Sequence, residues 1–319
     1  MNQSLYQTPE FFRGVVEDVL DPKKLGRVRV RVFGIHSEKK ARTHTSGIAT
    51  NELPWASVGQ PVTSAALNGI GKSPEILAGT WVYGYTLDGP AFQDLLITGT
   101  LPGIPYEVAN KQQGFSDPSG TYPKEDHIGE SDINRLARNE NIDKTVVEMK
   151  KIDRDKGVPT ASGSEWDEPE TPYAAEYPKN HVYESESGHI KEVDDTPGAE
   201  RTHEYHTSGT FKEVYPDGTK VEKIIGSDYE IIAADKKVYI KGDCTVTILG
   251  NAEVYVEGNA ITVVKGNEER TIKGDINETV NGNVTRKVGG NVTETTGGSK
   301  TSETSGEDTI KASILHLNP

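Results

Sequence analysis

A glycine recurs at every eighth residue through the C-terminal part of the chain, and this spacing constrains the fold more than any other feature. Two positions before the glycine stands a valine or isoleucine over nine successive repeats, and the residue after it is mostly asparagine or aspartate. Gly followed by Asn or Asp favours a turn, and strand side chains alternate with period two. Each octad is therefore predicted to be one short strand and a corner. The predicted corner glycines are Gly242, Gly250, Gly258, Gly266, Gly274, Gly282, Gly290, Gly298 and Gly306.

So short a unit cannot close a hydrophobic core by itself, and no pattern longer than eight residues indicates a chain coiled on its own. Three chains wound together meet the requirement, because each supplies one wall of a triangular tube and the Val/Ile rows meet on its axis. Octads spanning residues 218–306 would form a shaft of roughly 55–60 Å at about 4.8 Å per strand, without free sheet edges. The predicted trimer core consists of Ile224, Ile232, Ile240, Ile248, Val256, Val264, Ile272, Val280 and Val288.

Two other structures for the repeats fit less well. A calcium-binding β-roll needs Gly-Gly-x-Gly-x-Asp at a period of nine, which the sequence lacks. A disordered glycine-rich tail conflicts with the regular Val/Ile row. Cys244 shares the parity of the inward row, so we expect it to be a buried, small apolar residue.

Composition supports an all-β, turn-rich protein. Apolar residues make up only 33% of the 319 residues, and the chain contains 33 Gly and 17 Pro. The net charge of −14 argues against binding nucleic acid or anionic membranes through the electrostatic field. No apolar run approaches the ~20 residues that span a bilayer, and residues 1–12 lack the features of a secretory signal. A single cysteine excludes a disulfide framework and a cysteine-based zinc site.

Residues 1–105 are predicted to form a five-stranded OB-type barrel. Residues 27–32 alternate Arg and Val, so the valines face one side and Arg27, Arg29 and Arg31 the other. We expect this basic face to be solvated or to dock a protein, because binding of single-stranded nucleic acid would require interleaved aromatic residues. The other expected strands are residues 11–19, 53–58, 80–86 and 95–100.

Residues 106–180 are polar and are predicted to be an extended linker with one short helical stretch. Ser131 or Asp132 is expected to cap a short helix, and prolines favour an extended path through residues 165–173. The apolar residues of this stretch are Ile133, Leu136, Ala137, Val146, Val147 and Met149. Residues 181–217 are then predicted to be strands that lead into the prism, residues 218–309 the octad shaft, and residues 310–319 a tip segment.

Four stretches carry a resemblance to a known family. They are residues 12–32, 53–66, 114–120 and 186–198. They resemble the central spike proteins of contractile-tail phage baseplates, of the T-even spike-lysozyme type, and more distantly the VgrG spikes of type VI secretion. The resemblance implies an N-terminal OB-fold collar and a C-terminal intertwined triple-stranded β-helix in a homotrimer.

The resemblance also implies a mechanical function in the virion tail baseplate. The collar would seat on a trimeric hub protein below the tail tube, and sheath contraction would drive the prism through the host outer membrane. The apolar residues 310–319 would either plug the end of the prism or dock a separate tip protein. Such spikes often end in a PAAR-type tip protein, for which Ile314, Leu315, His316 and Leu317 are the candidate docking residues. We expect no cofactor, no metal and no nucleic-acid partner. The alternatives are a VgrG-like delivery spike and, with less support, a cell-wall hydrolase.

No catalytic residue is predicted. Hydrolase members of the family carry a lysozyme domain where this chain has residues 124–165, which is near the ~40-residue floor for independent folding. A cleft with two carboxylates ~5–9.5 Å apart needs a rigid scaffold, so we expect Glu125, Asp126, Glu130 and Asp132 to be solvated linker charges. There is no Gly-x-Ser-x-Gly motif. His203 and His206 would lie on opposite faces of a strand, as ordinary polar residues rather than a metal pair.

Overall fold

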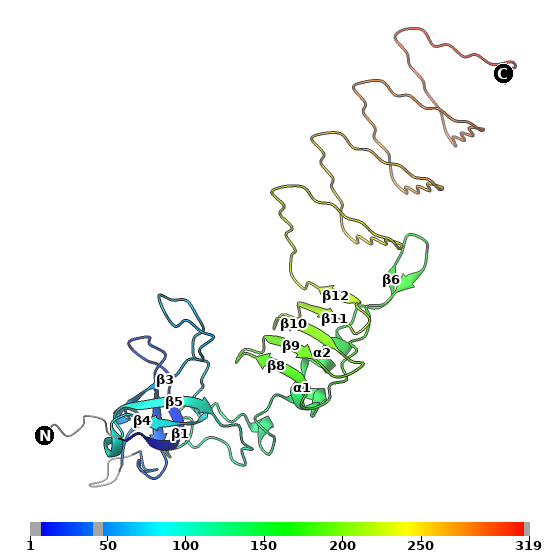
Figure 1. The fold of residues 1–319 in the computed structure, drawn as a ribbon. Helices are drawn as coiled ribbons and strands as arrows, with labels where there is room; N and C mark the ends of the chain where they lie inside the picture. The colour runs from blue at the N-terminus through cyan, green and yellow to red at the C-terminus, as the bar shows by residue number, and fades with distance from the viewer. Residues whose placement is uncertain (1–7, 41–46, 316–319) are drawn as a thin grey trace. The chain divides into compact units, whose positions relative to one another are not determined.

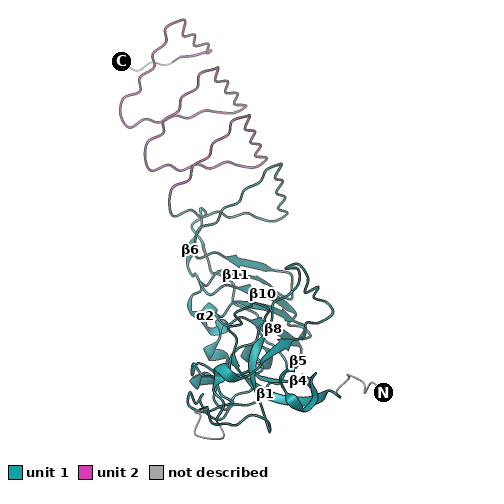
Figure 2. Ribbon diagram, turned by 90° about the vertical axis from the view of Figure 1, so that its left-hand side faces the viewer, with its two compact units in different colours: residues 1–250 teal, residues 251–319 magenta. Residues whose placement is uncertain are grey.

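A computed structural model describes residues 8–40 and 47–315 of the chain (Figure 1). The chain divides into two units, residues 1–250 and residues 251–319 (Figure 2). None of the helices among the described residues is long and apolar enough to cross a bilayer.

The N-terminal part is a closed five-stranded barrel with the strand order β1-β2-β3-β5-β4. Strands β3 and β5 pair in parallel, and the other neighbouring strands are antiparallel. Valines of β2 point into the barrel together with Phe12, Val16, Leu95 and Ile97. The predicted OB-type barrel is therefore confirmed. Its strands are β1 (Glu10–Asp18), β2 (Val28–Val32), β3 (Trp55–Val58), β4 (Trp81–Thr86) and β5 (Leu95–Thr100), with 3-10 turns η1 (Thr50–Glu52) and η2 (Gly89–Ala91).

The arginines of residues 27–32 do not form the solvated face that the alternation predicts. Arg31 is fully buried, and its guanidinium pairs with the equally buried carboxylate of Glu17 at 2.6 Å. Arg27 pairs with Asp21 at 2.7 Å, and Arg29 lies over the ring of Trp55. The expectation is wrong for Arg31 because loops cover this outer side of the barrel, which strand periodicity does not reveal.

A second sheet follows further along the chain, an antiparallel meander with the strand order β12-β11-β10-β9-β8. Alternate residues of β9 and β10 are buried on one face and exposed on the other. This sheet includes the residues predicted to lead into the prism, and here its pairing lies within one chain. Its strands are β8 (Asn180–Glu184), β9 (Ile190–Asp194), β10 (Arg201–Tyr205), β11 (Phe211–Val214) and β12 (Lys220–Lys223).

Part of the predicted extended linker is instead folded onto this sheet. Helix α1 (Arg135–Arg138) buries Leu136, and α2 (Val146–Ile152) buries Val146 and Val147. These side chains share a core with Ile190, Tyr205 and Phe211 of the sheet. The remaining short elements are η3 (Glu125–His127), η4 (Ile142–Lys144), β6 (Val158–Pro159) and β7 (Glu165–Trp166).

Helix α1 begins later than predicted. Asn134, and not Ser131 or Asp132, is its N-cap, and the Asn134 side chain accepts a hydrogen bond from the Leu136 amide at 2.8 Å. The Asp132 carboxylate is engaged elsewhere, because it accepts from the Gly103 amide at 2.7 Å. Met149 of α2 is 47% exposed, so it does not join the expected apolar set.

The octad region runs as a succession of open coils (Figure 1). No strand is formed by its described residues 224–315, and no backbone–backbone hydrogen bond joins them. The chain bends at each of the nine predicted corner glycines. The intertwined β-helix thus stays a prediction. Residues 220–223 of the predicted shaft form β12 and pair with β11 of the same chain. The described residues 224–315 make no backbone–backbone hydrogen bonds in one chain, although the Ile225 amide donates to the Thr210 hydroxyl at 3.1 Å.

Candidate functional site

The Val/Ile row of the octads is the candidate assembly surface. Its nine residues are 40–57% exposed in the single chain, whereas other apolar octad residues such as Ile231 and Val254 are 91% and 89% exposed. Exposed apolar rows and unpaired strand-like backbone both favour pairing with further strands. The row therefore has the properties of one part of a shared core.

The corner glycines do not adopt the positive φ angles that would require glycine in a turn. None of those nine is among the positive-φ residues of the described chain. A Cβ at each of them would meet no atom within 4 Å. A single chain therefore contains no steric reason for glycine at these positions.

A buried ionic network lies under helix α2 on the covered face of the sheet. Arg201 of β10 bridges two carboxylates, with Glu213 at 2.6 Å and Glu192 at 2.5 Å. The Nδ1 atom of His203 lies 3.1 Å from Glu192, and Lys150 of α2 pairs with Glu213. Helix α2 is thus held to the sheet by charge as well as by its apolar residues.

Burial and pairing set the protonation of this network. Burial lowers the pKa of His203, so the imidazole is held in its neutral form despite the hydrogen bond to Glu192. Burial opposes ionisation of Glu192, but the hydrogen bond from His203 and the charge of Arg201 outweigh it and lower its pKa. Glu213 has a lowered pKa for the same kind of reason, because Lys150 and Arg201 outweigh its desolvation. Both carboxylates are therefore ionised at neutral pH and balance the cations around them.

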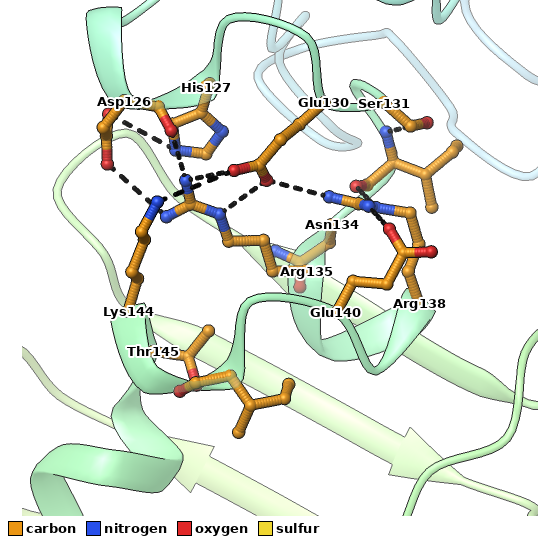
Figure 3. A network of polar contacts seen from close by, with 12 residues as sticks. Asp126, His127, Glu130, Ser131, Asn134, Arg135, Arg138, Glu140, Lys144 and Thr145 are labelled. Atoms are coloured by element: carbon orange, nitrogen blue, oxygen red, sulfur yellow. Dashed lines mark hydrogen bonds and ion pairs between the residues drawn. The ribbon is translucent and has the colours of Figure 1, made fainter.

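A second network surrounds Glu130, which lies in the turn that precedes helix α1 in the chain (Figure 3). The Glu130 carboxylate accepts two hydrogen bonds of 2.9 Å from Arg135 and one of 3.2 Å from Arg138. Hydrogen bonds from Arg135 lower the pKa of Glu130 from its usual 4.5 to about 2. Glu130 is therefore not the solvated linker charge that the sequence predicts, although Asp126 beside it is well exposed.

This arrangement bears on the chemistry of residues 124–165. A general acid in a glycosidase needs a raised pKa, so that it still holds a proton at working pH. Glu130 has the opposite shift and is saturated by arginine. The network fixes the turn before α1, and its Glu130 carboxylate is not suited to act as a general acid.

A third network ties loops to the barrel. The Arg31 guanidinium donates to the carbonyls of Ser37 at 2.5 Å and Ile48 at 2.7 Å. Its partner Glu17 accepts from the Thr50 hydroxyl at 2.7 Å and from the Phe115 amide at 2.8 Å. One buried ion pair thus anchors the segment after β2 and the segment that leaves the barrel.

The remaining predicted residues are placed as follows. His203 is buried and His206 exposed, so they do lie on opposite faces, but His203 belongs to the buried network and is not an ordinary polar strand residue. Cys244 is exposed in the single chain, and its expected burial is not met there. Ile314 and Leu315 are 70% and 55% exposed, while His316 and Leu317 lie outside the described residues.

Sequence reasoning missed all three networks. No local signal identified them, because charged residues at strand positions, such as Glu192, Arg201 and Glu213, normally indicate a solvated face. Among the described residues, no group of three or more His, Cys, Asp or Glu side chains is arranged to hold a metal.

Comparison with known proteins gives a family match that begins after β2 and ends in β8, so it covers β3, β4 and β5 of the barrel and the segment with α1 and α2. Residues 34–181 match the Gp5 N-terminal OB domain family. The chain is also 45% identical over 263 residues to Protein Gp5 of Vibrio phage KVP40, covering 73% of this chain and 62% of that protein. The chain is similar to the Gp5 proteins of phages. The resemblance to T-even central spikes is thereby confirmed.

A second Gp5 relative matches over a shorter stretch. It is the pre-baseplate central spike protein Gp5 of Enterobacteria phage T4, 51% identical over 115 residues, which is 36% of this chain and 20% of that protein. The chain spans less than two thirds of the length of both Gp5 relatives.

Proposed function

We propose that this chain is the structural central spike of a contractile-tail baseplate in a phage virion. The observation that carries the proposal is the similarity to Gp5 together with the octads of the described residues 224–315, which form no strand pairing within one chain. The barrel serves as the collar that seats on a trimeric hub protein. The octads form the intertwined trimeric shaft that links the hub to a PAAR-type tip protein and is driven through the host outer membrane during infection.

The function is mechanical rather than enzymatic. Two observations support this within residues 124–165, where lysozyme-bearing spikes of this type carry their hydrolase domain. The segment is occupied by α1, α2 and their connections, which fold against the sheet, and its most buried carboxylate, Glu130, is paired with arginine. Purified full-length chain should therefore leave isolated peptidoglycan intact in a turbidity assay. Clearing of the suspension would contradict this part of the proposal.

The spike proposal is tested through its assembly. Light scattering should give a mass near 104 kDa, about three times the 34.7 kDa of one chain, and the trimer should survive SDS without boiling. The double variant Val256→Asp with Val264→Asp places two acidic layers in the predicted core, where three unpaired carboxylates meet per layer. We expect that variant to remain monomeric.

A matched control separates the core row from its neighbours. Tyr255 and Val263 are one residue away and are 89% and 79% exposed. The variant Tyr255→Asp with Val263→Asp carries the same added charge on the opposite strand face, so it should still assemble. A heat-resistant trimer from the Val256/Val264 variant, or a wild-type chain of 34.7 kDa in solution, would refute the shared core.

A further inference from the structure

Two histidines meet at one end of the sheet β8–β12. The paired residues of β9 and β10 end with Ile190 opposite Tyr205, and His189 and His206 are the next residues outward along these two strands. Their ring centroids lie 4.5 Å apart, with an angle of 45° between the ring planes. His203, the histidine nearest to His206 in the sequence, lies instead on the covered face of the sheet. The pair is therefore brought together by strand pairing between two hairpins.

The histidine pair lies on the face of the sheet that is not covered by α1 and α2. Side chains alternate along a strand, so His189 and His206 share the face of the exposed Lys191 and Glu204. His189 is half-buried and His206 is exposed, so solvent reaches both rings in one chain. The same face carries a row of charged residues at paired positions, namely Lys191, Glu204, Lys212 and Glu222.

Tight turns hold the backbone of both histidines. In the turn between β8 and β9, the Ser185 amide donates to the His189 carbonyl at 2.9 Å, and the His189 amide donates to the Ser185 hydroxyl at 3.0 Å. In the turn between β10 and β11, the His206 amide donates to the Thr210 carbonyl at 2.8 Å, and the Gly209 amide donates to the His206 carbonyl at 2.9 Å. Both imidazoles are thus carried on fixed hairpin ends, as a preorganised site requires.

Each ring has a nitrogen available for coordination. The Nδ1 atom of His206 lies 2.9 Å from the Ser208 hydroxyl oxygen, and a protonated Nδ1 can donate to it and leave the Nε2 lone pair free. Metal-bound histidines usually make such a hydrogen bond through their second ring nitrogen. Nδ1 in its unprotonated form accepts from the Ser208 amide at 3.1 Å instead, so metal binding selects the other tautomer. Among the described residues, the His189 ring nitrogens have no hydrogen-bond partner.

We propose that His189 and His206 together bind one divalent transition-metal ion such as Zn²⁺, with water in the remaining coordination positions. With metal–nitrogen bonds of about 2.0–2.1 Å and an angle of about 90–110° at the metal, two imidazole centroids lie roughly 4.5–5.2 Å apart, which matches the observed 4.5 Å. Neutral imidazole suits Zn²⁺, Cu²⁺ and Ni²⁺, whereas Mg²⁺ prefers oxygen ligands. Both ligands come from one chain, so this inference goes beyond the proposed spike and does not depend on it. A bound ion would join the two turns and stiffen this end of the sheet.

Metal binding to the untagged, full-length chain tests the site. After bound metal has been removed with a chelator, isothermal titration at about pH 7.5, where imidazole is neutral, should show uptake of one Zn²⁺ per chain and no uptake of Mg²⁺. Loss of even an outer-shell partner weakens metal binding by about 10–100-fold, so His189→Ala and His206→Ala should each weaken Zn²⁺ binding by at least about tenfold. The matched control is His181→Ala, at an exposed histidine of β8 in the same sheet, and it should bind Zn²⁺ like the wild-type chain.

A second measurement on the wild-type chain needs no variant to fold. The electron paramagnetic resonance spectrum of bound Cu²⁺ should show coupling to two imidazole nitrogens, and Zn²⁺ should raise the urea midpoint of the chain because it binds the folded state. A wild-type chain that takes up no Zn²⁺, histidine variants that bind as tightly as wild type, or a Cu²⁺ spectrum with fewer than two nitrogen ligands would each overturn the site. A chain that stays monomeric and still binds Zn²⁺ through this pair would refute the spike proposal alone.

Discussion

Replacing Arg31 by leucine should destabilise the barrel far more than replacing any exposed arginine of the same domain. Both Arg31 and Glu17 have fully buried side chains. The variant Arg31→Leu would leave the Glu17 carboxylate buried without its cation, and the carbonyls of Ser37 and Ile48 without their donor. Removal of one partner from a buried ion pair costs about 3–5 kcal/mol.

The loss of stability expected for Arg31→Leu can be divided into the part due to the unpaired charge of Glu17 and the rest. Glu17 would keep its hydrogen bonds from Thr50 and Phe115, so we expect the lower half of that range, about 3–4 kcal/mol. In the Arg31→Leu background, Glu17→Gln removes the uncompensated charge and should recover about 1–2 kcal/mol. The matched control Arg13→Leu, on the exposed side of β1, should change stability by less than about 0.5 kcal/mol.

Urea unfolding followed by tryptophan fluorescence measures these differences. Trp55 and Trp81 lie in barrel strands, and Trp166 lies outside the barrel in β7. A Trp166→Phe background therefore confines the signal to the barrel. If Arg31→Leu cost no more than Arg13→Leu, the Arg31–Glu17 pair would have to be hydrated, and the argument for a covered outer face of the barrel would fail.

Three further outcomes follow from the networks around the sheet. Leu136→Ala should destabilise the sheet region by about 2–5 kcal/mol, whereas Met149→Ala, at a 47% exposed position, should cost less than about 1 kcal/mol, both read from urea midpoints. His203 has a lowered pKa in the folded chain, so the unfolded chain binds more protons below about pH 6.5 and stability should fall as the pH drops from 7.5 to 5. The variant His203→Gln should show a smaller decline over this pH range, and an equal decline in both chains would contradict the burial of a neutral His203. The lowered pKa of Glu130, about 2 against the usual 4.5, adds stability that is lost as the pH falls from about 4.5 toward 2. Glu130→Gln should therefore reduce the difference between the urea midpoints at pH 3 and pH 6, and the lowered pKa values of Glu192 and Glu213 account for part of what remains.

The barrel was predictable because its signals are local. The valines of residues 27–32 alternate strictly, and alternation determines which side of a strand can enter a core. The same reasoning gave the wrong environment for Arg31, because burial of the outer face depends on segments near residues 48 and 115 that are distant in sequence. Strand periodicity contains no information about loops that return from elsewhere in the chain.

The prediction of an extended linker in the middle of the chain was partly wrong for a related reason. Its composition resembles a linker, since charged residues and prolines outnumber apolar ones. Leu136, Val146 and Val147 nevertheless suffice, because the sheet provides the other half of their core. The buried ions Glu192, Arg201 and Glu213 were unpredictable from type alone, because each is stable there only through partners on other strands.

The sequence by itself determined the barrel strands, through the two-residue period of a strand, and the places of the bends and of the β-branched row, through the eight-residue spacing of glycine. The tertiary structure alone decided that Arg31 is buried, that residues 135–152 cover one face of the sheet, and that Lys191, Glu204, Lys212 and Glu222 lie side by side on the other. Register and covering are relations between segments far apart in the chain. Strand register and the covering of a face are determined when strands pair and charged side chains are desolvated together, so a local sequence pattern does not predict them.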